Sequence, residues 1–233
     1  MARKPFRQVA QSGKRKLITK LNPKSPVSEQ YRTIRTNIQF SAVDEEIRTL
    51  MVTSSGPGEG KSTTTANIAI VFAQQGKRVL LVDGDLRKPT VHYTFGMTNA
   101  AGLTNVLTRQ MSLTEATKES DVSGLSVLTS GPVPPNPAEL LSSKLMTSFI
   151  EEAKEHFDTI IFDTPPVLAV TDAQVLANQC DGTVLVISSG KTEIESAQKT
   201  KELLTAAKAK LLGVVLNRKK MDNSSYYYYY GTE

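Results

Sequence analysis

The hydrophobic positions of this chain follow two periodicities in turn. Short unbroken apolar runs, typical of parallel strands buried on both faces, fall at residues 48–53, 78–82, 125–128, 159–162, 182–187 and 211–216. Stretches with helical spacing lie between or before them, at residues 28–40, from 61 to about 75, and at 138–156, 171–178 and 193–209. Residues 90–124 are irregular, with short helical pieces. The alternation predicts an α/β fold of three layers, with a mostly parallel sheet covered by helices on both faces.

Length and composition fit one domain with two tails. A chain of 233 residues with 39% hydrophobic residues can bury a substantial core. We expect a flexible basic tail at 1–25, a domain at 26–217 and a flexible tyrosine-rich tail at 218–233. No apolar run approaches the ~18–20 residues of a membrane span, and the start lacks the apolar core of a signal peptide. The single cysteine, Cys180, excludes an internal disulfide and suits a cytoplasmic location.

The net charge of +5 comes from the first tail. Residues 1–24 hold eight Lys or Arg and no acid, which leaves 20 basic against 23 acidic residues in the remainder. Such a tail could touch anionic lipid or an acidic partner, or could simply aid solubility. Because the domain itself is slightly acidic, we expect no nucleic-acid partner.

One stretch carries the clearest chemistry, the sequence SSGPGEGKSTTT at 54–65. It follows an apolar strand and leads into a helix, the context that a phosphate-binding loop of the form G-x-x-x-x-G-K-[ST] requires. Backbone N–H groups and a helix N-terminus would hold the phosphates of ATP, Lys61 would reach the β- and γ-phosphates, and the hydroxyl of Ser62 would ligate Mg²⁺. The predicted nucleotide-binding residues are Gly56, Gly58, Glu59, Gly60, Lys61, Ser62, Thr63 and, at the end of the last strand, Asn217.

The loop departs from that pattern at one position, because Ser55 stands where the first glycine is usual. The alternative interpretation is a glycine-rich turn with a surface lysine. The intact end of the motif and its flanking strand and helix favour the phosphate loop.

Three carboxylates follow buried strands. Asp83 and Asp85 end one strand, and Asp163 ends another in the pattern of a Walker B aspartate. Ligands of parallel α/β sheets bind at these strand ends. We expect Asp85 and Asp163 to organise Mg²⁺, and Asp83 is the first candidate to accept a proton. The alternative is an acidic turn in which Asp85 caps a helix.

Two further patterns are open to two interpretations each. Residues Tyr226, Tyr227, Tyr228, Tyr229 and Tyr230 form a run that is either a sticky aromatic tail or a set of phosphoacceptors. In the helix at 28–40, Glu29, Arg32 and Arg35 recur every three residues. Spacing alone favours a solvated face with a Glu–Arg pair over a contact with another subunit.

Together these features resemble the bacterial tyrosine kinases of the P-loop type, and among them the free-standing catalytic chains of Gram-positive bacteria. The resemblance covers the chain from residue 25 onward. It rests on the tyrosine run and on five motifs, EQYRTIR (29–35), GEGKS (58–62), VDGDLRKP (82–89), TSGPVPPNPAELL (129–141) and IFDTPP (161–166). Eukaryote-like H-R-D and D-F-G kinase signatures are missing.

The resemblance implies an ATP- and Mg²⁺-dependent protein-tyrosine kinase whose tail is phosphorylated in the site of a neighbouring copy. It assigns Lys61, Asp83, Asp85 and Asp163 to catalysis, with Ser62, Asp85 and Asp163 at the metal. It assigns Glu29, Arg32 and Arg35 to the contacts of a ring-like homo-oligomer, which reverses the preference from spacing. The implied partners are a membrane adaptor that recruits the chain to the inner face of the membrane, protein substrates of exopolysaccharide or capsule synthesis, and a tyrosine phosphatase.

The rival hypothesis is a nucleotide-switched assembly ATPase of the chromosome-partitioning or septum-site type. Those proteins carry an extra lysine early in the loop, at the place that Gly56 occupies here. This difference argues for the kinase.

Overall fold

The computed structural model describes residues 17–41 and 46–220. Within these ranges seven strands form one sheet in the order β3-β4-β2-β5-β1-β6-β7. The strands are β1 (Thr49–Ser54), β2 (Val79–Asp83), β3 (Lys118–Glu119), β4 (Leu125–Leu128), β5 (Thr159–Asp163), β6 (Gly182–Ser188) and β7 (Leu211–Asn217). Every neighbouring pair is parallel except β3 and β4. The predicted α/β fold with a mostly parallel sheet is confirmed.

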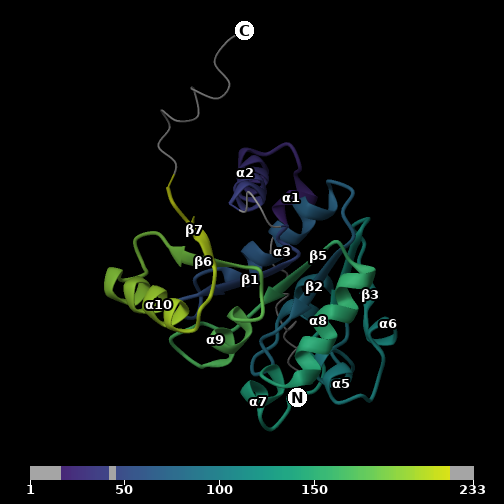
Figure 1. The fold of residues 1–233 in the computed structure, drawn as a ribbon. Coiled ribbons are helices and arrows are strands. Elements are labelled where there is room, and N and C mark those ends of the chain that lie inside the picture. Colours follow the sequence, from purple (N-terminus) through teal and green to yellow (C-terminus); the bar gives the residue numbers. More distant parts are fainter. Residues whose placement is uncertain (1–16, 42–45, 221–233) are drawn as a thin grey trace, which may run out of the picture.

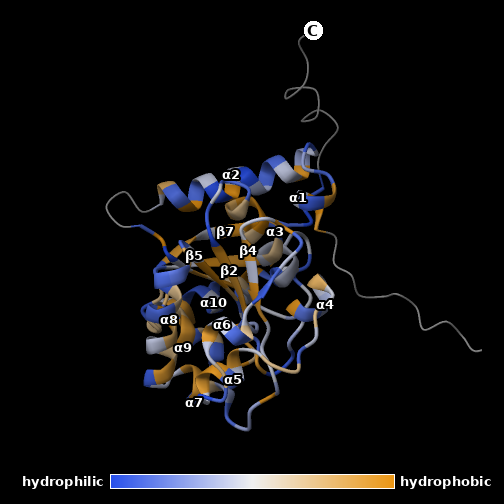
Figure 2. Cartoon of the chain, turned by 90° about the vertical axis from the view of Figure 1, so that its right-hand side faces the viewer, coloured by the Kyte–Doolittle hydropathy of each residue, from blue (hydrophilic) through white to orange (hydrophobic). Residues whose placement is uncertain are grey.

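Helices cover both faces of this sheet, as Figures 1 and 2 show. They are α1 (Ile18–Leu21), α2 (Pro26–Phe40), α3 (Lys61–Ala73), α4 (Val91–Phe95), α5 (Leu103–Leu107), α6 (Leu113–Ala116), α7 (Pro137–Leu141), α8 (Lys144–His156), α9 (Asp172–Ala177) and α10 (Ile194–Ala206). In the side view, α2 lies on one side of the strands and α8 and α9 on the other. No helix in the described ranges combines the length and apolar character that a membrane span needs.

Alternate residues of the strands feed two separate cores. Leu50 and Val52 of β1 pack with α2 and α3, through side chains such as Ile68 and Phe72. Met51, between them, belongs to the opposite core, which contains side chains of α8, α9 and α10. Successive side chains of a strand point to opposite faces, so an unbroken apolar run fills both layers at once.

One expected helix was wrong, and another helix was missed. The predicted helix at 138–156 is two helices, α7 and α8, because Ser143 between them has an extended backbone. Its hydroxyl donates to the carbonyl of Leu140 at 2.8 Å, a local bond that competes with helix continuation. Helix α4 was not predicted. The N–H groups of Thr90 and Val91, at its start, donate to the carboxylate of Asp83 at the end of β2. No local sequence pattern reveals this contact.

The expected flexible tail at 1–25 does not apply to residues 17–25. Leu17 is 7% exposed and Thr19 is fully buried. The backbone N–H and the hydroxyl of Thr19 both donate to Oδ1 of Asn67 in α3, at 3.0 and 2.8 Å. These residues are therefore part of the packed domain. The rest of the predicted basic tail and all five tail tyrosines lie outside the described residues.

Candidate active site

The loop between β1 and α3 has the backbone that its glycines predict. Gly58 and Gly60 adopt positive φ angles of 76° and 98°. A Cβ on Gly60 would lie 2.0 Å from the amide nitrogen of Asn217, so a side chain has neither the backbone conformation nor the space there. The loop opens directly into the 13-residue helix α3. Its N-terminus presents free N–H groups at this point, as an anion site requires.

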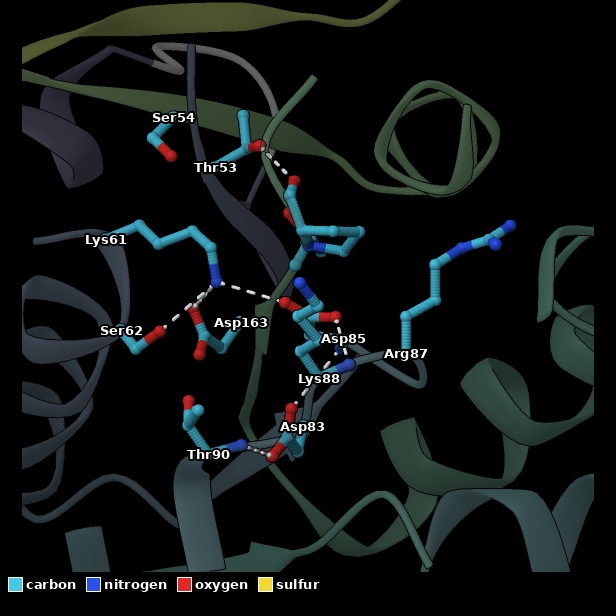
Figure 3. Close-up of polar contacts among 12 residues, drawn as sticks. Thr53, Ser54, Lys61, Ser62, Asp83, Asp85, Arg87, Lys88, Thr90 and Asp163 are labelled. Atoms are coloured by element: carbon cyan, nitrogen blue, oxygen red, sulfur yellow. Dashed lines mark hydrogen bonds and ion pairs between the residues drawn. The ribbon is translucent and has the colours of Figure 1, made fainter. Parts of the chain in front are cut away.

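Lys61, the first residue of α3, lies between two carboxylates (Figure 3). Its ammonium nitrogen is 3.5 Å from Oδ2 of Asp85 and 3.6 Å from Oδ1 of Asp163. It also donates to the hydroxyl of Ser62 at 3.2 Å. Three distant segments of the chain thus meet at one point. They meet because β5 pairs with both β1 and β2, which brings the ends of these strands together.

Asp83 is placed differently from Asp85. It is fully buried, and its carboxyl group accepts the backbone N–H groups of Thr90 and Val91, both at 2.9 Å, and that of Asp85 at 3.3 Å. In Figure 3 it points toward Thr90 and away from Lys61. Burial, and secondarily the charge of Asp163, raise the pKa of Asp83 to about 7, against the opposing effect of the backbone donors. Asp83 therefore fixes the segment that leads to α4, while Asp85 faces the lysine.

The residues at this point fit a magnesium ion. In the described part of the chain, Oδ2 of Asp163 is buried without a hydrogen-bond partner, although Oδ1 accepts the hydroxyl of Thr65 at 3.3 Å. Asp85 and the hydroxyl of Ser62 supply oxygen atoms beside the same lysine. In the described ranges, no group of three or more His, Cys, Asp or Glu residues is arranged to hold a metal ion. Mg²⁺ characteristically uses one or two carboxylates together with substrate phosphates, so this set of ligands suits it.

The other side of the loop is held by hydrogen bonds that the sequence did not predict. Glu59 is 7% exposed. One carboxylate oxygen accepts the N–H of Ser55 at 2.9 Å, and the other accepts the hydroxyl of Thr192 at 2.7 Å. The amide of Asn217 donates to the carbonyl of Glu59 at 2.8 Å. Thr192 lies 133 residues along the chain from Glu59, so no spacing rule could have found it.

A basic residue that seemed available for phosphate is already engaged. Arg87 follows Asp85 closely, and its positive charge would suit a phosphate ligand. Its guanidinium instead donates two hydrogen bonds to the fully buried carboxylate of Asp172, at 2.8 and 3.0 Å. In Figure 3 it points away from Lys61. This forked ion pair ties the segment after β2 to α9.

The remaining predicted residues lie where the sequence placed them on the elements. Thr63 is in the first turn of α3, and Gly56 borders a hollow beside the phosphate loop. On α2, Glu29 and Arg32 form an ion pair of 2.7 Å on the surface. Arg35 instead donates to the carbonyl of Val71 in α3 at 2.9 Å. The spacing-only expectation of a Glu–Arg pair is thus met, and Arg35 also holds α2 against α3.

Known proteins are similar to this chain in sequence and in fold. A family model described as an AAA domain matches residues 47–211. The tyrosine-protein kinase YwqD of Bacillus subtilis is 59% identical over 94% of this chain and 92% of its own length. A Staphylococcus aureus protein named putative tyrosine-protein kinase CapB is 47% identical over 91% of this chain and 93% of its own length.

Solved structures agree with this result. The chimerical protein CapA2B2 has a TM-score of 0.85 and 43% identity, covering 88% of this chain and 90% of its own. The kinase domain of the Escherichia coli tyrosine kinase ETK has a TM-score of 0.82 and 32% identity, covering 88% and 82%. On these matches, and with the phosphate loop and its carboxylates assembled at one sheet edge, the chain belongs to the bacterial P-loop tyrosine kinases.

Proposed function

We propose that this tyrosine-protein kinase transfers the terminal phosphoryl group of Mg·ATP to the tail tyrosines 226–230 of a second copy, and that it regulates exopolysaccharide or capsule synthesis. The observation that carries the proposal is the convergence of Lys61, Asp85 and Asp163 on one point. It occurs in a chain that is 59% identical to a curated tyrosine kinase.

The chemistry follows from these positions. The phenol oxygen of tyrosine forms a bond to the terminal phosphorus, the bond to the bridging oxygen breaks, and ADP leaves. Lys61 and the N–H groups of the loop offset the charge on the phosphates as that bond loosens. Ser62, Asp85 and Asp163 would hold Mg²⁺, which neutralises phosphate charge when bound.

The phenol proton needs an acceptor, because a tyrosine with a pKa of about 10 is protonated at neutral pH. Asp83 remains the proposed acceptor, since a carboxyl group with a pKa of about 7 suits a base that works near neutrality. Its bonds to Thr90 and Val91 oppose this role, because the carboxyl group must give up at least one of them to take the proton. The same contacts suit a residue whose only role is to position the segment between β2 and α4.

The direct test is mass spectrometry of the purified full chain, with and without Mg·ATP and after phosphatase treatment. We expect phosphate on residues 226–230 that disappears in Lys61→Met, at least 100-fold below the parental level. The matched control is Lys201→Met, an exposed lysine on α10, which should label normally. A clean tail in the parental chain, with ATP turnover intact, would contradict the kinase.

That contrary result would favour the assembly ATPase. A specific observation keeps this alternative in view: the cell-division ATPase MinD of Pyrococcus furiosus has a TM-score of 0.64 and 26% identity, covering 76% of this chain. Gly56 in the loop opposes it, since the proteins of that type carry a lysine there.

We also propose a cytoplasmic chain that a membrane adaptor recruits and activates at the inner face of the membrane. The proposal is supported by the solved protein CapA2B2, which has a similar fold. It is described as a chimera, and its name combines CapA with CapB. Protein substrates of polysaccharide synthesis and an opposing tyrosine phosphatase complete the proposed set of partners.

The proposed ring rests on α2. Glu29 and Arg32 pair on the surface of this helix, where a neighbouring subunit could reach them. Arg32→Ala combined with Arg35→Ala should reduce the oligomer to smaller species and cut tail labelling severalfold, measured by light scattering and mass spectrometry. Because Arg35 also bonds Val71 in α3, Arg32→Ala alone leaves the contact between the two helices intact and removes only the bonds of Arg32 to Glu29 and to the carbonyl of Pro23. Gln39→Ala, also on α2, is the control, and a full-size double variant would contradict the proposal.

A further inference from the structure

The two edges of the sheet differ in how they are protected. Among the described residues, β3 forms one edge and consists of two charged residues, Lys118 and Glu119. Strand β7 forms the other edge (Figure 1) and has seven residues without a charge or a proline. Short, charged strands keep a sheet edge from pairing with another chain, whereas a long apolar edge favours such pairing. The edge at β7 is therefore suited to receive one more strand.

The side chains of β7 are uncovered as well. None of its seven residues is buried, whereas every residue of β1, β2 and β5 is buried. Val214 is 52% exposed and Leu216 is 46% exposed. These two residues alternate with Val215 and so lie on one face of the strand. Large apolar side chains that lie together at the surface indicate a docking site.

Backbone groups of β7 also point away from the sheet. The carbonyl of Asn217 accepts the N–H of Ser189, just after β6, at 2.8 Å, so the backbone of Asn217 faces β6. The direction of these groups alternates along a strand, and the N–H and C=O groups of Leu216 and Val214 therefore point to the opposite side. No strand of the described ranges lies there. A further strand can form a ladder of hydrogen bonds with these groups.

A hollow of about 170 Å³ lies between β7 and α2. Its walls include Ile34 and Ile38 of α2 and Gly213 and Val215 of β7. A Cβ on Gly213 would meet nothing within 4 Å, so the space beside this glycine is open. The hollow is smaller than the roughly 300–1,000 Å³ of pockets for small ligands, and it suits one large side chain. Edge glycines of sheets are covered in this way by an aromatic ring from the neighbouring strand.

The segment best placed to cover this edge belongs to the same chain. Residues 221–233 lie outside the described residues and continue from Lys220, which closely follows the end of β7. At Arg218 the backbone φ is 59°, a left-handed conformation that turns the chain where the strand ends. A connection over residues 218–223 brings residues 224–230 antiparallel to β7, with equal lengths. That stretch reads SSYYYYY, without charge or proline, and tyrosine favours strands.

We propose that residues 224–230 of the unmodified tail dock in antiparallel order on the free edge of β7 in their own chain. In this register Tyr227 lies opposite Val214, an aromatic and β-branched pair of the kind that stabilises sheets. Tyr228 lies opposite Gly213 and places its ring in the hollow. Because the tail runs back from the end of β7, the docked tyrosines lie away from the phosphate loop of their own chain. The proposal goes beyond tyrosine phosphorylation, since docking requires no phosphoryl transfer.

Amide hydrogen exchange, resolved by residue with NMR, tests the docking. The full chain is treated with phosphatase and kept free of ATP, because a phosphate adds about 1.5–2 negative charges to a ring that faces apolar walls. We expect the N–H groups of Val214 and Leu216 to exchange at least tenfold more slowly than in a full chain with residues 226–230 changed to serine. Tyr93→Ser, which alters the exposed tyrosine of α4, is the matched control and should leave both rates unchanged. The slow exchange should persist on hundredfold dilution, because the docking is within one molecule.

A second pair of variants tests the backbone bonds. Val214→Pro removes an N–H that points away from β6, a position at which a sheet edge tolerates proline. Val214→Thr keeps this N–H and a branched side chain. Chymotrypsin cleaves after tyrosines that are not held in a strand, so its rate of cleavage at residues 226–230 reports docking. We expect Val214→Pro to raise this rate at least fivefold and Val214→Thr to stay within twofold of the parental chain.

Three results would overturn the proposal. One is an equal exchange rate in the parental and five-serine chains, since fast exchange in both leaves the edge open and slow exchange in both assigns it to another segment. The second is protection that disappears on dilution, which assigns the edge to a second copy. The third is equal cleavage of Val214→Pro and Val214→Thr. If Val214→Pro fails to fold, the exchange measurement still decides, because its substitutions at residues 226–230 leave the packed domain intact. A chain that transfers no phosphate would refute the proposed function and leave these measurements unaffected.

Discussion

The two flanks of Lys61 differ in how fully their carboxylates are hydrogen-bonded. On the side of β2 and β5, the lysine lies 3.5 and 3.6 Å from two carboxylates. Among the described residues, one oxygen of Asp163 there has no hydrogen-bond partner. On the side of β6 and β7, every bond of Glu59 to Ser55, Thr192 and Asn217 is between 2.7 and 2.9 Å.

This contrast separates the scaffold from the reacting part of the site. An unpaired polar atom in the interior costs free energy of about 1–3 kcal/mol, and more in a charged group, so a fold retains an unpaired carboxylate oxygen where a ligand completes the arrangement. Both oxygens of Glu59 accept hydrogen bonds, so this carboxylate needs no ligand and restricts the loop before one arrives. Among the described residues, the hydroxyls of Ser55 and Ser188 on this flank are buried without a partner, but they carry no charge. The flank of β2 and β5 is therefore the side that meets Mg²⁺ and phosphate, and the flank of β6 and β7 shapes the loop.

The largest effect should come from the under-satisfied flank. Asp163→Asn keeps the shape of the side chain and removes its charge, so we expect tail labelling to fall at least 100-fold. A second readout is independent of activity: Mg²⁺ should stabilise the ADP complex less in the variant than in the parental chain, measured by thermal unfolding with and without EDTA. Since the charge of Asp163 helps to raise the pKa of Asp83, the substitution should also lower that pKa.

The control for this change is Asp158→Asn, on a surface aspartate that pairs with Arg78. It should leave labelling and the response to Mg²⁺ unaltered. An Asp163→Asn chain that responds to Mg²⁺ as the parental chain does would mean that the unpaired oxygen does not mark the metal.

Much of this division could be anticipated from the sequence. Asp85 and Asp163 were expected beside Lys61, because each follows a buried parallel strand and such strand ends share one edge of a sheet. The glycines at positive φ were also readable, since the loop motif fixes where they fall. These predictions succeeded because local patterns and a general rule of topology were enough.

The other flank could not be read in this way. The bond from Glu59 to Thr192 depends on the packing of the loop after β6 against the phosphate loop, and neither residue type nor spacing announces it. The same limit hid the pair of Arg87 with Asp172. It also hid the break between α7 and α8, where one extended serine outweighs the helical pattern on both sides. Contacts between distant segments decide these features.

Asp83 is an exception to this contrast. It lies on the flank of β2 and β5, yet its carboxyl group accepts three backbone hydrogen bonds, as a structural residue would. Its pKa of about 7 exceeds the ~4 of an unfolded aspartate. Between these values the folded chain holds a proton that the unfolded chain releases. The contribution of this group to stability therefore falls as pH rises from about 4 to about 7. Asp83→Asn cannot ionise, so its unfolding free energy should depend less on pH in that window, by on the order of a few kcal/mol.

Chemical denaturation at several pH values measures this difference. Labelling by the same variant then distinguishes the two roles of the residue. If Asp83 accepts the phenol proton, Asp83→Asn should lose labelling while keeping its affinity for ADP and for the acceptor. If Asp83 only positions the segment between β2 and α4, the affinity for ADP and the affinity for the acceptor should fall together. A pH profile of stability identical to the parental one would show that folding does not raise the pKa of Asp83.

The smallest expected effect tests the well-bonded flank. Thr192→Val preserves volume and removes the hydroxyl, which leaves Oε1 of Glu59 and the N–H of Ser188 without their partner. We expect ADP affinity to fall about three- to tenfold, because a hydrogen bond to a charged group contributes roughly 1.5–3 kcal/mol and water can replace part of it at this half-buried position. Thr192→Ser retains the hydroxyl and should bind ADP normally. Titration of a fluorescent ADP analogue measures both. Equal affinities in the two variants would mean that the loop keeps its shape without this bond, and that a fully hydrogen-bonded carboxylate on this flank does not by itself identify the scaffold.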